Sequence, residues 1–164
     1  MKSFTLLTVF AAAAAFSTSA FAEASVTVSG VHNCCKSCVK GIEAAVAKVA
    51  GASAVTDGTT VTITAKNEAD AKKAVASLVE GGYYGEGATA PAVTDAKVKS
   101  ATVGGVHLCC GKCVTAVEKA VKGVSGVTTH SAAKGVKTFT VEGDFSTKEL
   151  AAALNKAGFN GSIQ

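Results

Sequence analysis

Apolar positions along the chain follow two spacings, and the same succession of spacings occurs twice. Ser25–Ser29 and Ser100–Val103 alternate between polar and apolar residues, which is typical of a half-buried strand. A helical spacing follows in each half, carried first by Val39, Ile42, Val46 and Val49 and then by Val114, Val117, Val121 and Val124. We expect these two stripes to be the core-facing sides of equivalent helices.

Each half then continues with two strands, a second helix and a last short strand. The alternating strands are Thr59–Ala65 and Lys137–Glu142, each preceded by a weaker strand near Ala54 or Val127. The second helices run from Glu68 to Val79 and from Thr147 to Lys156, and the last short strands follow Gly82 and Gly158. The latter helix has a capping box, with Ser146 at the N-cap and Glu149 three residues on. The order β-α-β-β-α-β predicts an α+β fold of two tandem ferredoxin-like βαββαβ sandwich domains.

An internal repeat supports this division. Gly30-Val31-His32-Asn33-Cys34-Cys35-Lys36-Ser37-Cys38-Val39 recurs 75 residues later as Gly105-Val106-His107-Leu108-Cys109-Cys110-Gly111-Lys112-Cys113-Val114, with seven of ten positions identical. The stretch around the single proline, Pro91, is typical of a linker. We therefore expect a first domain at residues 23–88, a linker at 89–97 and a second domain at 98–164.

The amino terminus has the pattern of an export signal. Lys2 precedes an apolar run, and Ala20-Phe21-Ala22 offers a small-x-small cleavage site. The run is shorter than the roughly 20 residues that cross a membrane, although an uncleaved anchor is the alternative. We expect a signal peptide at residues 1–22 and a periplasmic or secreted protein that has no membrane segment after cleavage.

Composition excludes several classes of function. The formal net charge is only +4, and every basic residue is lysine, so the bidentate guanidinium that reads phosphates and bases is missing. Nucleic acid is therefore not an expected partner. The chain has no tryptophan, which disfavours a large aromatic ligand pocket. It also shows no catalytic motif beyond its thiols, so we expect a protein that is not an enzyme.

Six cysteines fall into two clusters of three, each within five residues. Disulfides at such short spacing would constrain the chain very little. The CxxC pairs Cys35 with Cys38 and Cys110 with Cys113 lie at a helix start, where positions i and i+3 share a face. Free N–H groups and the helix dipole favour thiolate there, and thiolate binds soft ions such as Cu(I), as well as Zn(II) and Hg(II).

Further donors accompany each pair. His32 and Cys34 precede the first pair, and His107 and Cys109 precede the second, which gives four candidate ligands per loop. Adjacent side chains in an extended backbone point in opposite directions, so Cys34 and Cys35 can share an ion only if the loop turns tightly. We therefore expect the CxxC sulfurs to form the core of each site, with Cys34 or His32 as a third or an exit ligand.

These residues resemble the heavy-metal-associated domain family, the small copper-chaperone and mercury-carrier fold. The matching positions are Gly30, Cys35, Cys38, Val39, Ile42, Gly51 and Gly82-Tyr83, then Gly105, Cys110, Cys113, Val114, Val117, Gly126 and Gly158-Phe159. The resemblance implies metal binding by the two CxxC pairs, with Tyr83 and Phe159 near the loops. The family usually has Gly-Met-x-Cys, whereas this sequence has Gly-Val-His-x-Cys-Cys, a loop longer by two residues.

We therefore expect an exported heavy-metal-binding protein with one cysteine-rich site per domain, acting as a carrier, chaperone or store. Cu(I) is the favoured ion, with Zn(II) or Hg(II) as alternatives, and a metal-transporting or metal-accepting protein is a candidate partner. The alternative is a thiol-disulfide redox protein that uses Cys35 and Cys110 as nucleophiles. A third interpretation is an interaction module whose cysteines are merely oxidised.

Overall fold

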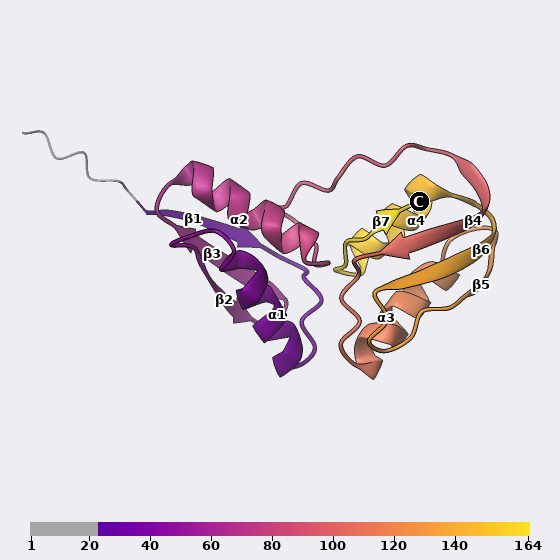
Figure 1. Cartoon of the computed structure of the whole chain (residues 1–164), viewed down its shortest axis with the longest axis horizontal. Coiled ribbons are helices and arrows are strands. Elements are labelled where there is room, and N and C mark those ends of the chain that lie inside the picture. Colours follow the sequence, from indigo (N-terminus) through magenta and orange to yellow (C-terminus); the bar gives the residue numbers. More distant parts are fainter. Residues whose placement is uncertain (1–22) are drawn as a thin grey trace, which may run out of the picture.

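The computed structural model describes residues 23–164, so the signal peptide expected at residues 1–22 lies outside the described residues. The elements form two α+β halves that lie side by side (Figure 1). The first half contains β1 (Ala24–Val28), α1 (Lys36–Val46), β2 (Ser53–Asp57), β3 (Thr60–Ala65) and α2 (Glu68–Glu80). The second half contains β4 (Lys97–Gly104), α3 (Gly111–Lys122), β5 (Val127–His130), β6 (Thr138–Ser146), α4 (Thr147–Lys156) and β7 (Ser162–Ile163). The predicted α+β fold is confirmed.

Both sheets are antiparallel, with the order β1-β3-β2 in the first half and β5-β6-β4-β7 in the second. In each half the two helices pack against one another and against strands of their own sheet. The segment after α2 carries no helix or strand between residues 89 and 96 and runs along one side of the molecule to β4 (Figure 1). The two halves are referred to below as the first and second domains.

The last strand predicted after Gly82 is not a strand in the structure. Within its own domain it is reduced to the bridge between Ser29 and Glu86, in which each backbone N–H donates to the other's carbonyl. The chain leaves the sheet edge directly afterwards at Gly87, whose φ of +98° only glycine adopts easily. In the second domain the predicted last strand is present as β7, and it pairs with β4.

The buried side of each first helix starts one residue earlier than the valine stripe suggested. Cys38, Ile42 and Val46 are fully buried at i, i+4 and i+8, whereas Val39 is only half-buried. In α3 the same positions are Cys113, Val117 and Val121, again fully buried. The second cysteine of each CxxC pair is thus part of the hydrophobic core, and packing of the helix fixes where its sulfur lies.

The second helices begin at side-chain caps. The Ser146 side chain accepts a hydrogen bond from the Glu149 N–H at 3.2 Å, which confirms the predicted cap of α4. Asn67 caps α2 in the same way, by accepting from the Asp70 N–H at 2.9 Å. Neither α1 nor α3 has such a cap, because a cysteine occupies the N-cap position of each.

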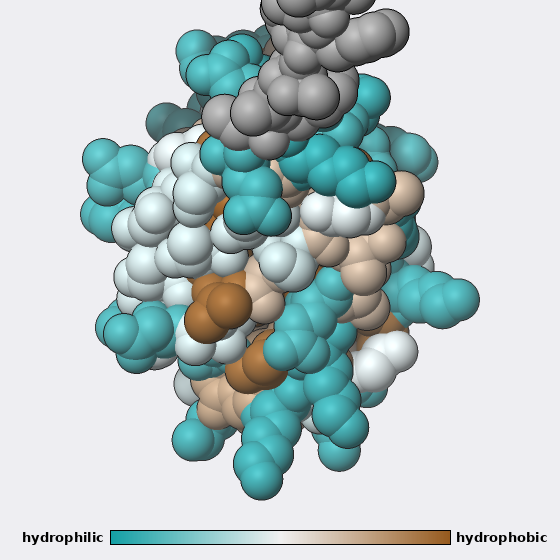
Figure 2. Space-filling view, turned by 90° about the vertical axis from the view of Figure 1, so that its left-hand side faces the viewer, coloured by the Kyte–Doolittle hydropathy of each residue, from teal (hydrophilic) through white to brown (hydrophobic). Residues whose placement is uncertain are grey.

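Hydrophilic side chains predominate on the side of the first domain that Figure 2 shows, and its apolar residues are scattered. Val55 is the one large apolar side chain counted as exposed in residues 23–164. None of the helices in this described part of the chain is both long and apolar enough to span a membrane.

Candidate metal centre

Each cysteine loop is held at both ends by the fold of its own domain. Val31 and Val106, which follow the positive-φ glycines Gly30 and Gly105, are buried in the core. At the other end the loop enters a helix, with extended backbone at Cys35 (φ −163°) and Cys110 (φ −149°). Between these points Cys34 and Cys109 are half-buried. The loops are therefore short spans between two fixed points.

The two loops meet, and their six sulfur atoms form one group. Nine pairs of sulfurs lie 3.4 to 3.9 Å apart, and five of these pairs join one domain to the other. All six cysteines are free thiols. We call this group the six-sulfur cluster; its members are Cys34, Cys35, Cys38, Cys109, Cys110 and Cys113.

The contacts across the domain boundary repeat with the symmetry of the sequence. Cys34 lies 3.4 Å from Cys110, and the equivalent pair, Cys109 and Cys35, lies 3.7 Å apart. The Cys38 and Cys113 sulfurs, which are each other's equivalents, are 3.9 Å apart. The two domains therefore face one another about an approximate twofold axis at the cluster.

This arrangement differs from the expectation of a separate site in each domain. It also answers the question about neighbouring cysteines, because Cys34 and Cys35 do converge: with Cys38 they offer three sulfurs within 4.8 Å of one another. A second group of three, Cys35, Cys109 and Cys110, draws on both domains. The extra cysteine before each CxxC pair is thus a full member of the cluster.

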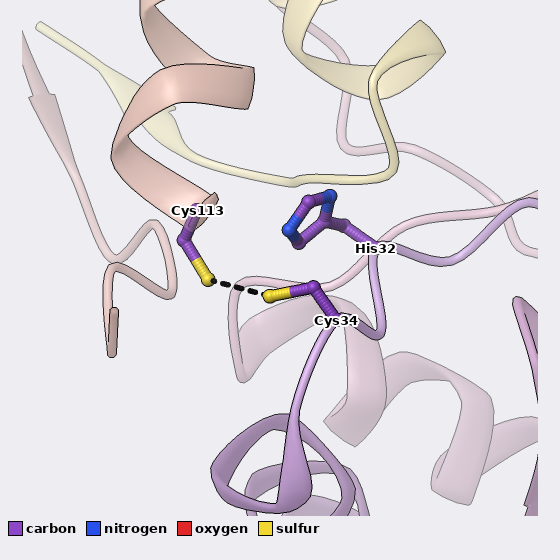
Figure 3. A group of neighbouring side chains, drawn as sticks. All are labelled: His32, Cys34 and Cys113. Atoms are coloured by element: carbon purple, nitrogen blue, oxygen red, sulfur yellow. Dashed lines mark hydrogen bonds between the residues drawn. The ribbon is translucent and has the colours of Figure 1, made fainter. Parts of the chain in front are cut away.

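Both predicted histidine ligands lie at the cluster. His32, Cys34 and Cys113 offer donor atoms within 4.8 Å of one another, and Figure 3 shows the imidazole beside the two sulfurs at the start of α3. His107 forms the equivalent group with Cys38 and Cys109. The Nε2 atoms of both rings are buried and have no hydrogen-bond partner. A buried nitrogen without a partner is costly, so these atoms are available to a ligand.

The imidazole rings also connect the domains. His32 stacks on Phe159 of the second domain with 4.4 Å between ring centres, and His107 packs on Tyr83 of the first domain at 4.7 Å. The aromatic residues expected near the loops therefore lie against the loop of the opposite domain. Burial lowers the pKa of both histidines, which keeps the imidazoles neutral and able to bind a metal ion.

The thiols divide into two kinds by their electrostatic surroundings. The backbone N–H of Cys38 at the start of α1 lowers the pKa of Cys35 to about 6, and the N–H of Cys113 lowers that of Cys110 in the same way. Burial raises the pKa of Cys109 to about 12 and also raises the pKa values of Cys34 and Cys113. The N-cap cysteines therefore have lowered pKa values, in the direction that the helix-start argument predicted, whereas that argument was wrong for Cys113, whose pKa burial raises.

Glycines at the ends of the second helices allow the domains to approach. Gly82 and Gly158 have φ near +88°, and a Cβ on Gly82 would lie 2.7 Å from the His107 nitrogen. A Cβ on Gly158 would lie 2.7 Å from the Gly30 carbonyl oxygen and closer still to the His32 nitrogen. Real side chains do not reach such distances, so any other residue here would push the domains apart.

Backbone hydrogen bonds join the domains next to these glycines. The Gly158 carbonyl accepts from the N–H groups of His32 (3.2 Å) and Tyr84 (3.1 Å), and the Gly82 carbonyl accepts from Asn160 (3.0 Å). Asn160 also donates from its side chain to the Val79 carbonyl at 3.0 Å. Sequence analysis missed the roles of Tyr84 and Asn160. Their equivalent positions, one residue after each glycine-aromatic pair, were the only available signal.

Comparison with known proteins gives one family match, which lies in the second domain. Residues 102–160, which include His107 and the second cysteine cluster, match the family model of the heavy-metal-associated domain. The match supports a heavy-metal-binding role. The solved N-terminal soluble domains of CopA from Bacillus subtilis are 19% identical, with a TM-score of 0.34, covering 87% of this chain and 95% of that one. No curated protein matches the chain.

Proposed function

We propose that this protein binds a thiophilic heavy-metal ion, Cu(I) in first place and Zn(II) or Hg(II) as alternatives, and that it carries or stores the ion after export. The observation that supports this most directly is the six-sulfur cluster. Its thiols are free and lie in contact with one another across the domain boundary, and the pKa values of two of them, Cys35 and Cys110, are lowered by backbone N–H groups. Soft sulfur donors select soft ions.

The spacing of the sulfurs fits metal coordination. With a metal–sulfur bond of about 2.3 Å, sulfurs around a tetrahedral ion lie about 3.8 Å apart and around a trigonal ion about 4.0 Å apart. The observed 3.4 to 3.9 Å agrees with both, after small movements. A linear two-coordinate ion needs about 4.6 Å. The cluster is therefore arranged for three or four sulfurs per ion rather than for the two of an isolated CxxC pair.

The role that follows is binding rather than catalysis, with transfer to or from a metal-accepting or metal-transporting protein. Each loop contributes a buried sulfur on its helix and two half-buried sulfurs before it. Half-buried donors are reachable by an incoming ligand, so an ion can be exchanged between proteins without unfolding either domain. Replacement of bound ion by the partner's thiols would be the transfer step.

The test is to isolate the protein anaerobically from the compartment to which it is exported, and to measure its metal content and its free-thiol count. We expect bound metal with all six cysteines reduced. The pair Cys38→Ser and Cys113→Ser should lose tight binding, because it removes one sulfur from each helix. Competition against a Cu(I) chelator measures the loss. Disulfides in place of metal, together with turnover of a disulfide substrate, would instead support the redox alternative.

A further inference from the structure

We propose that the two loops do not hold one ion each but together bind a single polynuclear Cu(I)–thiolate cluster of four ions, which forms only when the domains are docked. This inference rests on the proposed function and specifies the form of its cargo. The observation that supports it is the position of the six sulfurs relative to one another.

The six sulfurs have the connectivity of an octahedron. Nine pairs lie within 3.9 Å, and three more, Cys34 with Cys35, Cys35 with Cys110 and Cys109 with Cys110, lie within 4.8 Å. Every sulfur then has four neighbours and one opposite member. The opposite pairs are Cys34 with Cys109, Cys35 with Cys113 and Cys38 with Cys110. These twelve neighbour pairs are the edges of the octahedron.

An octahedron of sulfurs offers eight triangular faces, and each is a three-sulfur site. Cu(I) accepts thiolate ligands readily and fits a triangle whose edges are about 4.0 Å when its bonds are about 2.3 Å. Four ions on alternate faces use each of the six sulfurs twice. The face formed by Cys34, Cys110 and Cys113 has edges of 3.4 to 3.7 Å and already spans both domains.

Charge favours several ions over one. A single ion binds at most four of the sulfurs, so two thiols would remain beside it without a metal. Four Cu(I) ions bind all six as thiolates, release their protons to solvent and leave a charge of −2, whereas one Zn(II) among six thiolates would leave −4. Residual negative charge in a part-buried site is costly.

The approximate twofold relation makes docking a condition for this cluster. Only four of the nine close sulfur contacts lie within one domain. A separated domain keeps three sulfurs and therefore one triangular face. Cu(I) binding should consequently hold the domains together, and separation of the domains should reduce the capacity from four ions to about two.

The experiment titrates Cu(I) anaerobically into the fully reduced protein in the presence of a competing chelator, with native mass spectrometry to count bound ions. We expect four ions per chain, taken up cooperatively so that two-ion species are scarce. Copper X-ray absorption of the loaded protein should show copper–copper scattering. Two independent ions per chain without that scattering would overturn the inference but leave the proposed function intact, and no bound Cu(I) at all would overturn both.

Two kinds of variant separate the cluster from simple CxxC binding. The pair Cys34→Ser and Cys109→Ser keeps both CxxC pairs, and we expect its capacity to fall to two ions or fewer with no copper–copper scattering. Unchanged capacity would refute a six-sulfur cluster. Each variant is first checked by circular dichroism for native helix content.

The second variant acts on docking and changes no donor. Gly158→Ala places a methyl group against the backbone at His32 and Gly30, and we expect it to lose the four-ion species. Gly135→Ala is the matched control, since Gly135 also has a positive φ (+79°) but has nothing within 4 Å of the added Cβ. If Gly158→Ala is folded and still takes up four ions cooperatively, docking is not required and that part of the inference is wrong.

Discussion

Gly41 and Tyr83 provide a quantitative test of how the domains fit together. Gly41 lies in the middle of α1, where glycine is unfavourable, and a Cβ there would overlap the Tyr83 hydroxyl. It would also lie 3.1 Å from Cε1 of His107 in the second domain. The equivalent residue in α3 is Ala116, and its aromatic counterpart is Phe159, which has no hydroxyl. The first domain thus combines glycine in the helix with tyrosine, and the second combines alanine with phenylalanine; neither combination brings a Cβ against a hydroxyl.

The expected energies follow from these contacts. Gly41→Ala gains about 1 kcal/mol of helix propensity, but overpacking against Tyr83 and His107 costs about 1 to 3 kcal/mol, so the net change is a destabilisation of up to about 2 kcal/mol. Tyr83→Phe removes the hydrogen bond from the Tyr83 hydroxyl to the Cys38 carbonyl (3.2 Å), at a cost of about 0.5 to 1.5 kcal/mol. In the double variant the overlapping oxygen is gone, and the remaining neighbours are Cε1 of His107 at 3.1 Å and Cζ of residue 83 at 3.2 Å, which a shift of a few tenths of an ångström relieves.

The assay is urea unfolding of the reduced, metal-free protein and its three variants, evaluated as a double-mutant cycle. We expect Gly41→Ala to cost less in the Tyr83→Phe background by about 0.5 to 2 kcal/mol, since the overlap with the hydroxyl is removed and the contact with His107 stays. Ala116→Gly serves as the control and should cost about 1 kcal/mol, the helix-propensity difference. Equal costs of Gly41→Ala in both backgrounds would refute the reasoning, because the hydroxyl would then not be what excludes a side chain.

Two further predictions concern side-chain hydrogen bonds, at the helix caps and at the domain boundary. Ser146→Ala should lower the free energy of unfolding by about 1 kcal/mol through loss of the α4 cap, and Asn67→Ala should do the same through loss of the α2 cap. Urea midpoints compared at constant m-value test both substitutions. No change in either midpoint would mean that these caps do not stabilise the protein. Asn160→Ala should cost about 0.5 to 1.5 kcal/mol by removing its donor to the Val79 carbonyl. Because that bond joins the domains, hydrogen exchange should increase at His32 and Tyr84; faster exchange spread over a whole domain would instead indicate loss of its core.

The sequence predicts the fold because its signals are local. The β3 alternation that buries Val61 and Ile63, the Ser146 cap and the repeat of the cysteine loop each depend on residues close in the chain. The last strand of the first domain was predicted wrongly, since the bridge at Glu86 ends where Gly87 turns the chain away. That turn depends on a backbone conformation which a glycine permits but does not require.

The identity of the candidate ligands was also accessible from the sequence, but their arrangement was not. Helix-start spacing placed Cys35 beside Cys38 correctly, since i and i+3 share a face. Nothing local indicates that Cys34 lies against Cys110, because that contact depends on how two folded domains meet. The meeting is set by backbone approach at Gly82 and Gly158, and each of these glycines is equally consistent with an ordinary helix end.

Because sulfurs of opposite domains lie in contact, the separation of the two domains and the affinity for metal are thermodynamically coupled. By linkage, any factor by which bound metal favours the closed form is also the factor by which opening weakens metal binding. A recipient protein that binds only the open form would therefore withdraw the whole load at once, without having to outcompete each thiolate in turn.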